Sequence, residues 1–319
     1  MKTTTKKAIK ILIPIVLAIF FGWYTFSQIP VSEIIPYFKK ADYSWIIIGV
    51  FCGVLSHLSR AYRWRYLLEP LGYKVSFPNR IMAVFIGYLT NYGIPRSGEV
   101  LRAAAITNYE KVPFEKSFGT IVAERAADLL VMLGIVAITL ILQFDYIFGL
   151  LEQSIPLKKL LILGVVGLIL VFLLVLFIKK SKGKFAQKLK TFMKGLLEGA
   201  TSILKMEHKW AFIAHTLFIW IMYIMMFYIT TFSIEEVSGL SVGAILVSFI
   251  ATSLTIAATN SGLFVYPLAV AATFSLFGIP ELPSIAFGWI VWSSQTLMVI
   301  LFGVLSFIFL PIYNQKPHK

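Results

Sequence analysis

The chain has 319 residues, of which 58% are hydrophobic and only 14% are charged, and its mean hydropathy is +0.83. This composition excludes an ordinary soluble domain and predicts an all-α, polytopic integral membrane protein. With no soluble domain predicted, the formal net charge of +14 indicates membrane topology and attraction to anionic lipid headgroups rather than nucleic-acid binding. The single cysteine, Cys52, excludes an intramolecular disulfide and a multi-cysteine metal site.

Several apolar runs approach the roughly 20 residues that a helix needs to cross a bilayer. They cover residues 8–28, 44–59, 117–144, 160–178, 210–232 and 285–310. A broken pair at 242–258 and 263–279 brings the expected number of crossings to about eight. The basic start of the chain also fits a cleavable signal peptide, but the first run ends in the bulky FGWYTFSQIP, without a small-x-small site, so we predict a retained helix.

Three arginines, Arg60, Arg63 and Arg65, mark the inner end of the second run, in HLSRAYRWRYLL. No nearby acid before Glu69 balances them, so we expect surplus positive charge at the inner rim of the membrane. Because a guanidinium group donates two parallel hydrogen bonds to phosphate, these residues are candidates for lipid binding. The alternative is snorkelling to the interface beside neighbouring aromatic residues.

The next apolar segment, residues 81–94, is too short to span and ends around Asn91 and Pro95 before a second helical stretch follows. This pattern predicts a re-entrant hairpin, with two ordinary tight turns as the alternative. Its second arm carries base, acid and base in Arg96, Glu99 and Arg102, and the last two share one helical face.

The run from residue 117 contains a compact acid–base–acid cluster of Glu124, Arg125 and Asp128. Glu124 and Asp128 are four residues apart and share a face, and Arg125 and Asp128 are three apart. Together with the charges of the hairpin they make three arginines and three carboxylates. We therefore predict a neutral, buried network between the two segments.

A basic stretch at 183–205 separates two halves, 1–178 and 210–319, of what we predict to be one transmembrane domain covering residues 1–319. Its apolar residues recur near helical period, which predicts an amphipathic helix on the inner membrane surface. The alternative is a plain basic linker. In the second half, a polar break at Asn260 and Gly262 interrupts a long apolar stretch, and paired interruptions of this kind are typical of transporters.

Most lysines and arginines fall in loops on the side of the two termini, so both termini are predicted to be cytoplasmic. We expect a multi-pass protein of the cytoplasmic (inner) membrane. The sequence contains no P-loop, HExxH or GxSxG motif, and its four histidines lack ligand spacing. We therefore predict no catalytic residues, no metal and no cofactor.

Three motifs resemble the transmembrane region of the lysylphosphatidylglycerol synthases, a family that also includes stand-alone flippase-like membrane proteins. They are RAYRWRYLL (60–68), NYGIPRSGEVLRAA (91–104) and AERAADLL (123–130). The resemblance implies a helical bundle of about eight spans with re-entrant helices, and a role in moving or presenting lipid-linked headgroups. It places functional weight on Asn91, Pro95, Gly98, Glu99, Arg102, Glu124, Arg125 and Asp128.

The second half departs from that family pattern. The turn with an acidic residue that many members carry reads NSGLFVYP here, with Pro267 at the acidic position, and Trp289, Trp292 and Gln295 lie where an arginine is usual. Since only nine residues follow the last run, we also expect the aminoacyl-transferring domain to be missing.

The sequence favours a flippase-like protein that translocates or presents an anionic, glycosylated or aminoacylated lipid. Two alternatives stay open, namely a membrane-embedded enzyme or accessory subunit of lipid modification, and a proton-coupled solute transporter that uses Glu124 and Asp128. The expected partners are membrane lipids with anionic headgroups and a separate lipid-modifying enzyme, with no nucleic acid. The sequence does not determine the oligomeric state.

Overall fold

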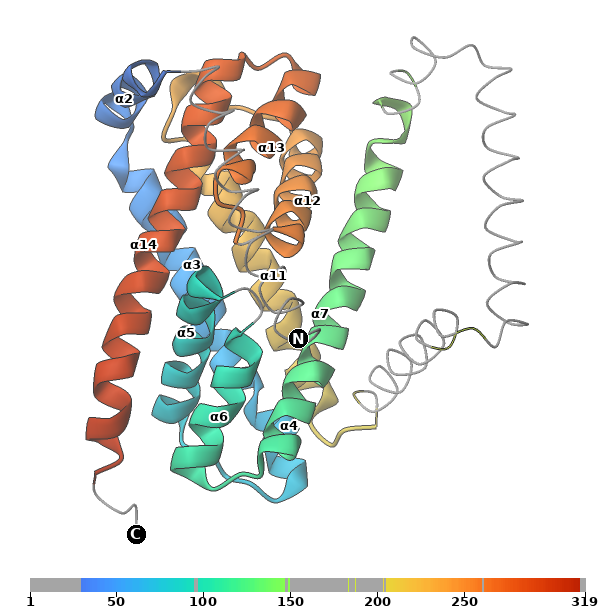
Figure 1. Ribbon diagram of the computed structural model, residues 1–319. Coiled ribbons are helices and arrows are strands. Elements are labelled where there is room, and N and C mark those ends of the chain that lie inside the picture. The colour runs from blue at the N-terminus through green and yellow to red at the C-terminus, as the bar shows by residue number, and fades with distance from the viewer. Residues whose placement is uncertain are drawn as a thin grey trace. The chain divides into compact units, whose positions relative to one another are not determined.

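The computed structural model describes residues 30–94, 97–146, 205–259 and 261–315, with isolated residues 149, 183, 187 and 203. This part of the chain is helical and contains no strand, which confirms the all-α prediction (Figure 1). The chain divides into two compact units, one of Met1–Glu124 with Trp210–Lys319 and the other of Arg125–Lys209. The basic stretch 183–205 lies almost wholly outside the described residues, so the amphipathic helix predicted there remains a prediction.

Within the described residues, four long helical segments are apolar enough to cross a membrane. The first is continuous from Tyr43 to Leu71 and consists of α3 (Tyr43–Arg63), α4 (Arg65–Leu68) and a 3-10 turn, Glu69–Leu71. The others are α7 (Phe114–Leu142), α11 (Lys209–Thr231) and α14 (Glu281–Tyr313). These confirm four predicted spans and the membrane class. The runs at 8–28 and 160–178 lie outside the described residues, so the number of crossings stays a prediction.

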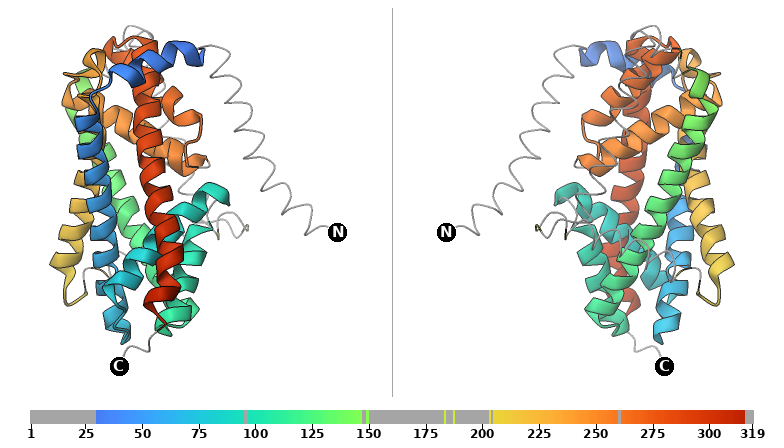
Figure 2. Two further views of the ribbon diagram at one scale, coloured as in Figure 1. Left: turned by 90° about the vertical axis from the view of Figure 1, so that its left-hand side faces the viewer. Right: turned by 90° about the vertical axis from the view of Figure 1, so that its right-hand side faces the viewer.

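A short helix that the sequence did not single out, α2 (Val31–Lys40), precedes α3. Figure 2 shows it lying across the end of α14, transverse to the long helices. Ile34 is buried while Val31 and Ile35 are exposed, and Lys39 and Lys40 close its last turn. An amphipathic helix in this orientation is typical of the membrane–water interface.

Two pairs of short helices form the remainder of the larger unit. One consists of α5 (Phe77–Gly93) and α6 (Gly98–Glu110), and the other of α12 (Val242–Ala258) and α13 (Val265–Phe274), the latter followed by a 3-10 turn, Ser275–Phe277. Each helix is shorter than a span of about 20 residues. In Figure 2 the pairs lie at opposite ends of α14, and their turns point toward its middle. Both interrupted segments therefore fold as helical hairpins, which is the arrangement that the sequence predicted for the first.

The base of the α5/α6 hairpin is fixed by a polar network. One carboxylate oxygen of Glu110, at the end of α6, accepts hydrogen bonds from the backbone N–H of Ser76 at 2.9 Å, the Ser76 hydroxyl at 2.6 Å and the Asn79 amide at 2.7 Å. The side-chain amides of Asn79 and Asn314 also pair reciprocally, each bond 2.8 Å long. These contacts tie the start of α5 to the ends of α6 and α14.

An apolar core holds the inner faces of this hairpin against the spanning helices. It contains Trp64 at the α3–α4 junction, Leu68 of α4, Ala83 and Ile86 of α5, and further residues from α6 and the start of α7. Burial of this kind contributes on the order of 25 cal/mol per Å² of apolar surface. The hairpin is therefore a packed part of the larger unit, and its charged residues are carried to fixed positions.

Candidate functional site

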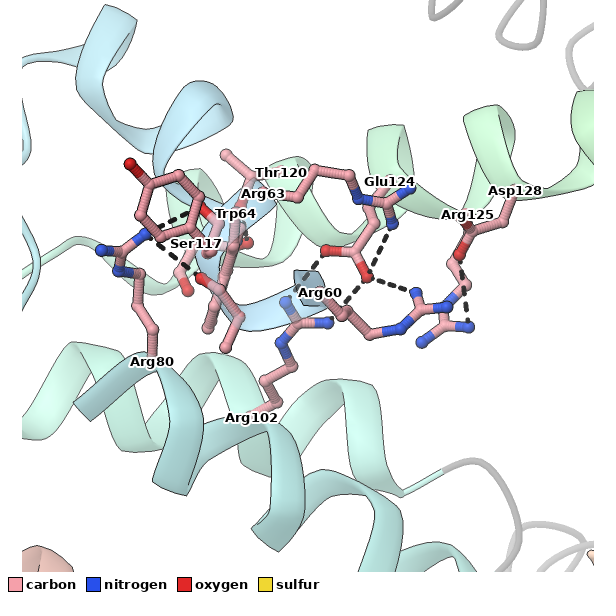
Figure 3. Close-up of polar contacts among 12 residues, drawn as sticks. Arg60, Arg63, Trp64, Arg80, Arg102, Ser117, Thr120, Glu124, Arg125 and Asp128 are labelled. Atoms are coloured by element: carbon pink, nitrogen blue, oxygen red, sulfur yellow. Dashed lines mark hydrogen bonds and ion pairs between the residues drawn. The ribbon is translucent and has the colours of Figure 1, made fainter. Parts of the chain in front are cut away.

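The centre of the candidate site is the carboxylate of Glu124, which is fully buried in α7 and contacts three arginines (Figure 3). Arg102 from α6 binds it through two nitrogens, with Nη1 3.0 Å from Oε1 and Nη2 2.9 Å from Oε2. Arg60 Nη1 lies 2.7 Å from Oε1, and Arg63 Nη2 lies 3.3 Å from the same oxygen. We call these four side chains the arginine cluster.

Polar and aromatic groups of α11 surround two of the arginines. Arg63 Nη1 donates a hydrogen bond to the Thr216 hydroxyl at 2.8 Å, and its guanidinium lies 5.1 Å from the centre of the Phe212 ring. Arg60 Nη2 donates to the Tyr223 hydroxyl at 3.4 Å. These contacts fix both guanidinium groups in orientation, because each is held from more than one side.

Trp64 supports the cluster from the α3–α4 junction. The guanidinium carbon of Arg102 lies 3.8 Å from the centre of the indole ring, a close cation–π contact. The indole N–H donates to the Thr120 hydroxyl at 2.8 Å, and Thr120 donates in turn to the Ser117 carbonyl at 2.6 Å. Because Thr120 lies one turn before Glu124, this chain of contacts fixes the first turns of α7, up to Glu124, relative to the end of α3.

Arg80 is a further buried arginine near the site. Its Nη1 donates to the backbone carbonyls of Ala61 at 3.2 Å and Tyr62 at 3.0 Å, near the C-terminal end of α3. Carbonyls at a helix C-terminal end favour a positive charge, so Arg80 stabilises the junction between α3 and α4. It lies close to the arginine cluster but contacts a different part of α3 (Figure 3).

The predicted surplus of Arg60 and Arg63 at a half-hydrated rim is wrong. Their side chains are 2% and 0% exposed, and both bind Glu124, which is 64 and 61 residues away in sequence. The prediction considered only acids close to these arginines in sequence. The acid that pairs with them is Glu124, which the fold brings to α3 from a distant part of the sequence. Arg65 differs from the other two, because it is about one-third exposed and pairs with Glu69 at 3.3 Å.

The predicted network between the hairpin and α7 is confirmed for Arg102 and Glu124. Glu99 is half-buried, and Arg96 lies outside the described residues. In the second unit, Arg125 and Asp128 form the predicted pair at 3.8 Å, with Asp128 buried and Arg125 42% exposed. The buried ion pairs therefore centre on Glu124 and include Arg60 and Arg63 of α3. The predicted network had contained only charges of the hairpin and α7.

At the tip of the first hairpin, Asn91 and Gly98 hold the two arms together. The Asn91 side-chain oxygen accepts a hydrogen bond from the Gly98 backbone N–H at 2.8 Å, at the first turn of α6. A β-carbon on Gly98 would collide with the carbonyl of Gly87 and with the Asn91 amide. Only glycine allows this close crossing, and Pro95 lies outside the described residues.

The second hairpin turns through an unwound segment. Gly262 has φ of +76°, and two non-glycine residues also have positive φ, Ser261 at 54° and Phe264 at 62°. Trp292 of α14 donates its indole N–H to the Ser261 carbonyl at 2.8 Å. Asn260 lies outside the described residues. The predicted break is therefore confirmed at Gly262, and its backbone is strained in a way that recurs at functional sites.

Sequence reasoning missed Arg80, Trp64 and Thr120 as parts of the site. In the sequence, Arg80 is only one of the basic residues on the side of the two termini, and Trp64 only one of the aromatic residues beside Arg63 and Arg65. A charge at the fourth position of an otherwise apolar short helix was a usable signal for Arg80, because a lone buried charge requires a partner. Thr120 gave no such signal, since a threonine in a membrane helix usually bonds its own backbone.

These features define the class as a multi-pass helical membrane protein with two helical hairpins and a buried arginine cluster. A family model described as the lysylphosphatidylglycerol synthase TM region matches residues 11–303. The chain therefore belongs to this family, and the resemblance noted from the three motifs is confirmed.

Two known proteins are each similar to part of the chain. The UPF0104 membrane protein MJ1595 of Methanocaldococcus jannaschii is 25% identical over 130 residues, 40% of this chain and 39% of that protein. Glycosyltransferase AglD of Haloferax volcanii is 29% identical over 111 residues, 34% of this chain and 18% of that protein. The matched segments thus cover well under half of either relative. No solved structure matches the chain.

Proposed function

We propose that this protein translocates, or presents for modification, a lipid with an anionic or glycosylated headgroup across the cytoplasmic membrane. The observation that carries the proposal is the arginine cluster, in which three buried guanidinium groups converge on one carboxylate. Buried charges within a membrane protein mark substrate pathways by default. Arginine also suits phosphate, because its planar fork matches two phosphate oxygens.

The two hairpins support a transport role. Broken helices place helix ends and unwound backbone at membrane depth, which is how many transporters build their substrate sites. Here the α5/α6 hairpin brings Arg102 to Glu124, and the α12/α13 hairpin exposes a strained turn toward the middle of α14. A phosphate that contacts the arginines would lie beside elements that can rearrange.

We propose no catalytic residue for the chain itself. A second role, presentation of lipid to a separate lipid-modifying enzyme, is favoured by the partial similarity to Glycosyltransferase AglD. The predicted orientation, with both termini cytoplasmic, places the arginine cluster in the cytoplasmic half of the membrane. The lipid would then be loaded from the cytoplasmic leaflet.

The test uses the purified protein in liposomes that contain phosphatidylglycerol with a fluorescent acyl chain. Dithionite added outside quenches only lipid that reaches the outer leaflet, so protein-dependent loss of the protected fraction reports translocation. We expect the protein to increase the rate at which the protected fluorescence is lost. Arg63→Lys should lower this rate, because lysine keeps the positive charge but lacks the planar guanidinium group that donates two parallel hydrogen bonds to phosphate. Arg65→Lys is the matched control, since Arg65 pairs with Glu69 outside the cluster.

Two outcomes separate the roles. Bound phosphatidylglycerol in the purified protein without faster translocation would favour presentation to an enzyme. Neither bound anionic lipid nor translocation above protein-free liposomes would overturn the proposal.

A further inference from the structure

The second half of the chain offers a ligand no ionic partner within the membrane. Between Lys209 and Lys316 the sequence has no lysine or arginine, and its acids there are only Glu235, Glu236 and Glu281. Glu235 and Glu236 lie in a 3-10 turn before α12, and Glu281 begins α14. The α12/α13 hairpin and the rest of α14 therefore present hydroxyl, amide, indole and backbone groups alone.

Four aromatic rings join the tips of the two hairpins; we call Tyr92, Phe264, Trp289 and Trp292 the aromatic cluster. The ring centres of Tyr92 and Trp292 are 6.5 Å apart, those of Trp289 and Trp292 are 5.7 Å apart, and those of Phe264 and Trp289 are 5.7 Å apart. All four side chains are half-buried. Each ring therefore keeps part of its surface available to a ligand.

Hydrogen-bonding groups lie among these rings. The hydroxyls of Tyr92 and Thr296 are 3.1 Å apart, and the Trp292 indole holds the Ser261 carbonyl at 2.8 Å. Ser261 and Phe264 keep positive φ values that non-glycine residues rarely adopt. Such a backbone conformation is energetically unfavourable for residues other than glycine. It places the Phe264 ring beside the ring of Trp289.

The arginine cluster and the aromatic cluster are connected along α5. Tyr92 lies one helical turn after Tyr88, whose hydroxyl is 3.3 Å from that of Tyr223. Tyr223 in turn accepts a hydrogen bond from Arg60 of the arginine cluster. A series of neutral hydroxyl groups thus leads from the buried guanidinium groups to the tip of the hairpin.

From this arrangement we propose that the aromatic cluster binds an uncharged, hydroxyl-rich part of the lipid headgroup, a sugar or a polyol, while the arginine cluster contacts the phosphate. Aromatic faces pack against the C–H faces of such groups, and neutral donors and acceptors bind their hydroxyls. An amine-bearing headgroup would find no carboxylate among these four residues, and a cation–π contact with the rings is the competing mode of binding that the test below separates. This inference rests on the proposed function and names the headgroup class that it serves.

The test measures lipid binding to the full-length protein in phosphatidylcholine nanodiscs by native mass spectrometry. Phosphatidylinositol and phosphatidylethanol are compared, because both carry one phosphodiester charge and only the first carries ring hydroxyls. We expect preferential retention of phosphatidylinositol. Trp289→Leu should reduce that preference roughly three- to tenfold and leave phosphatidylethanol unchanged. Trp210→Leu is the matched control, since Trp210 is 74% exposed at the start of α11.

A second variant guards against misfolding. Tyr92→Phe removes one hydroxyl and keeps the ring, so it should fold and still weaken the preference for phosphatidylinositol. An unchanged preference in both variants would overturn the inference, as would tighter binding of lysyl-phosphatidylglycerol than of phosphatidylinositol. Equal binding of phosphatidylinositol and phosphatidylethanol overturns this inference and leaves the proposed function standing. Failure of every anionic lipid to bind overturns both.

Discussion

Replacement of Glu124 by glutamine tests whether the arginine cluster is a structural unit. The carboxylate receives four nitrogen contacts between 2.7 and 3.3 Å, two of them from Arg102. Glutamine keeps one acceptor oxygen but turns an N–H₂ group toward a guanidinium, so it removes the negative charge and adds a donor. Loss of one partner of a buried ion pair costs about 3–5 kcal/mol. Three arginines depend on this carboxylate, so we expect the upper part of that range.

The assay is reversible unfolding in mixed detergent micelles, with bound lipid removed so that ligand does not mask the effect. Arg125→Gln is the control on the same helix, because its pair with Asp128 is 3.8 Å long and Arg125 is 42% exposed. An exposed pair contributes about 0–1 kcal/mol, so this variant should unfold close to the parent. If Glu124→Gln is as stable as Arg125→Gln, the carboxylate does not hold the arginines, and the argument for a buried cluster fails.

Three further predictions concern the hairpins and the topology. Gly98→Ala should destabilise the protein or abolish folding, because the new methyl group collides with backbone of α5, whereas Gly93→Ala, with open space around it, should be tolerated in a thermal-shift measurement. Glu110→Ala should lower the free energy of unfolding by about 1–3 kcal/mol, because three hydrogen bonds are lost. Glu110→Gln keeps an acceptor oxygen and should retain most of the stability. Equal free energies of unfolding for the two variants would show that this oxygen does not fix the hairpin base. In a cysteine-free background, Lys184→Cys should react with an impermeant reagent from the cytoplasmic side and Lys158→Cys from the other side, and the reverse pattern would contradict the orientation.

The membrane class, the helical fold and four spans followed from the sequence alone. A lipid bilayer leaves the backbone few options, so composition and run length were sufficient. The α12 helix was predicted at its observed bounds, Val242–Ala258, because the polar residues that end it cannot continue an apolar helix unpaired. The spacing of Arg125 and Asp128 likewise determined a local ion pair, since helical geometry alone brings residues three apart together.

Tertiary structure decided which charges meet. Arg60 and Arg63 are close in sequence to Glu69 but bind Glu124, and Arg80 caps the end of α3 rather than facing water. Periodicity gives the face of a helix on which a charge lies, but not the helix that will pack against that face. The contact of Tyr92 with Trp292 depends in the same way on the packing of α5 against α14. Such contacts arise from the packing of segments 200 and more residues apart, 204 for Tyr92 and Thr296, and a single sequence carries no local signal for them.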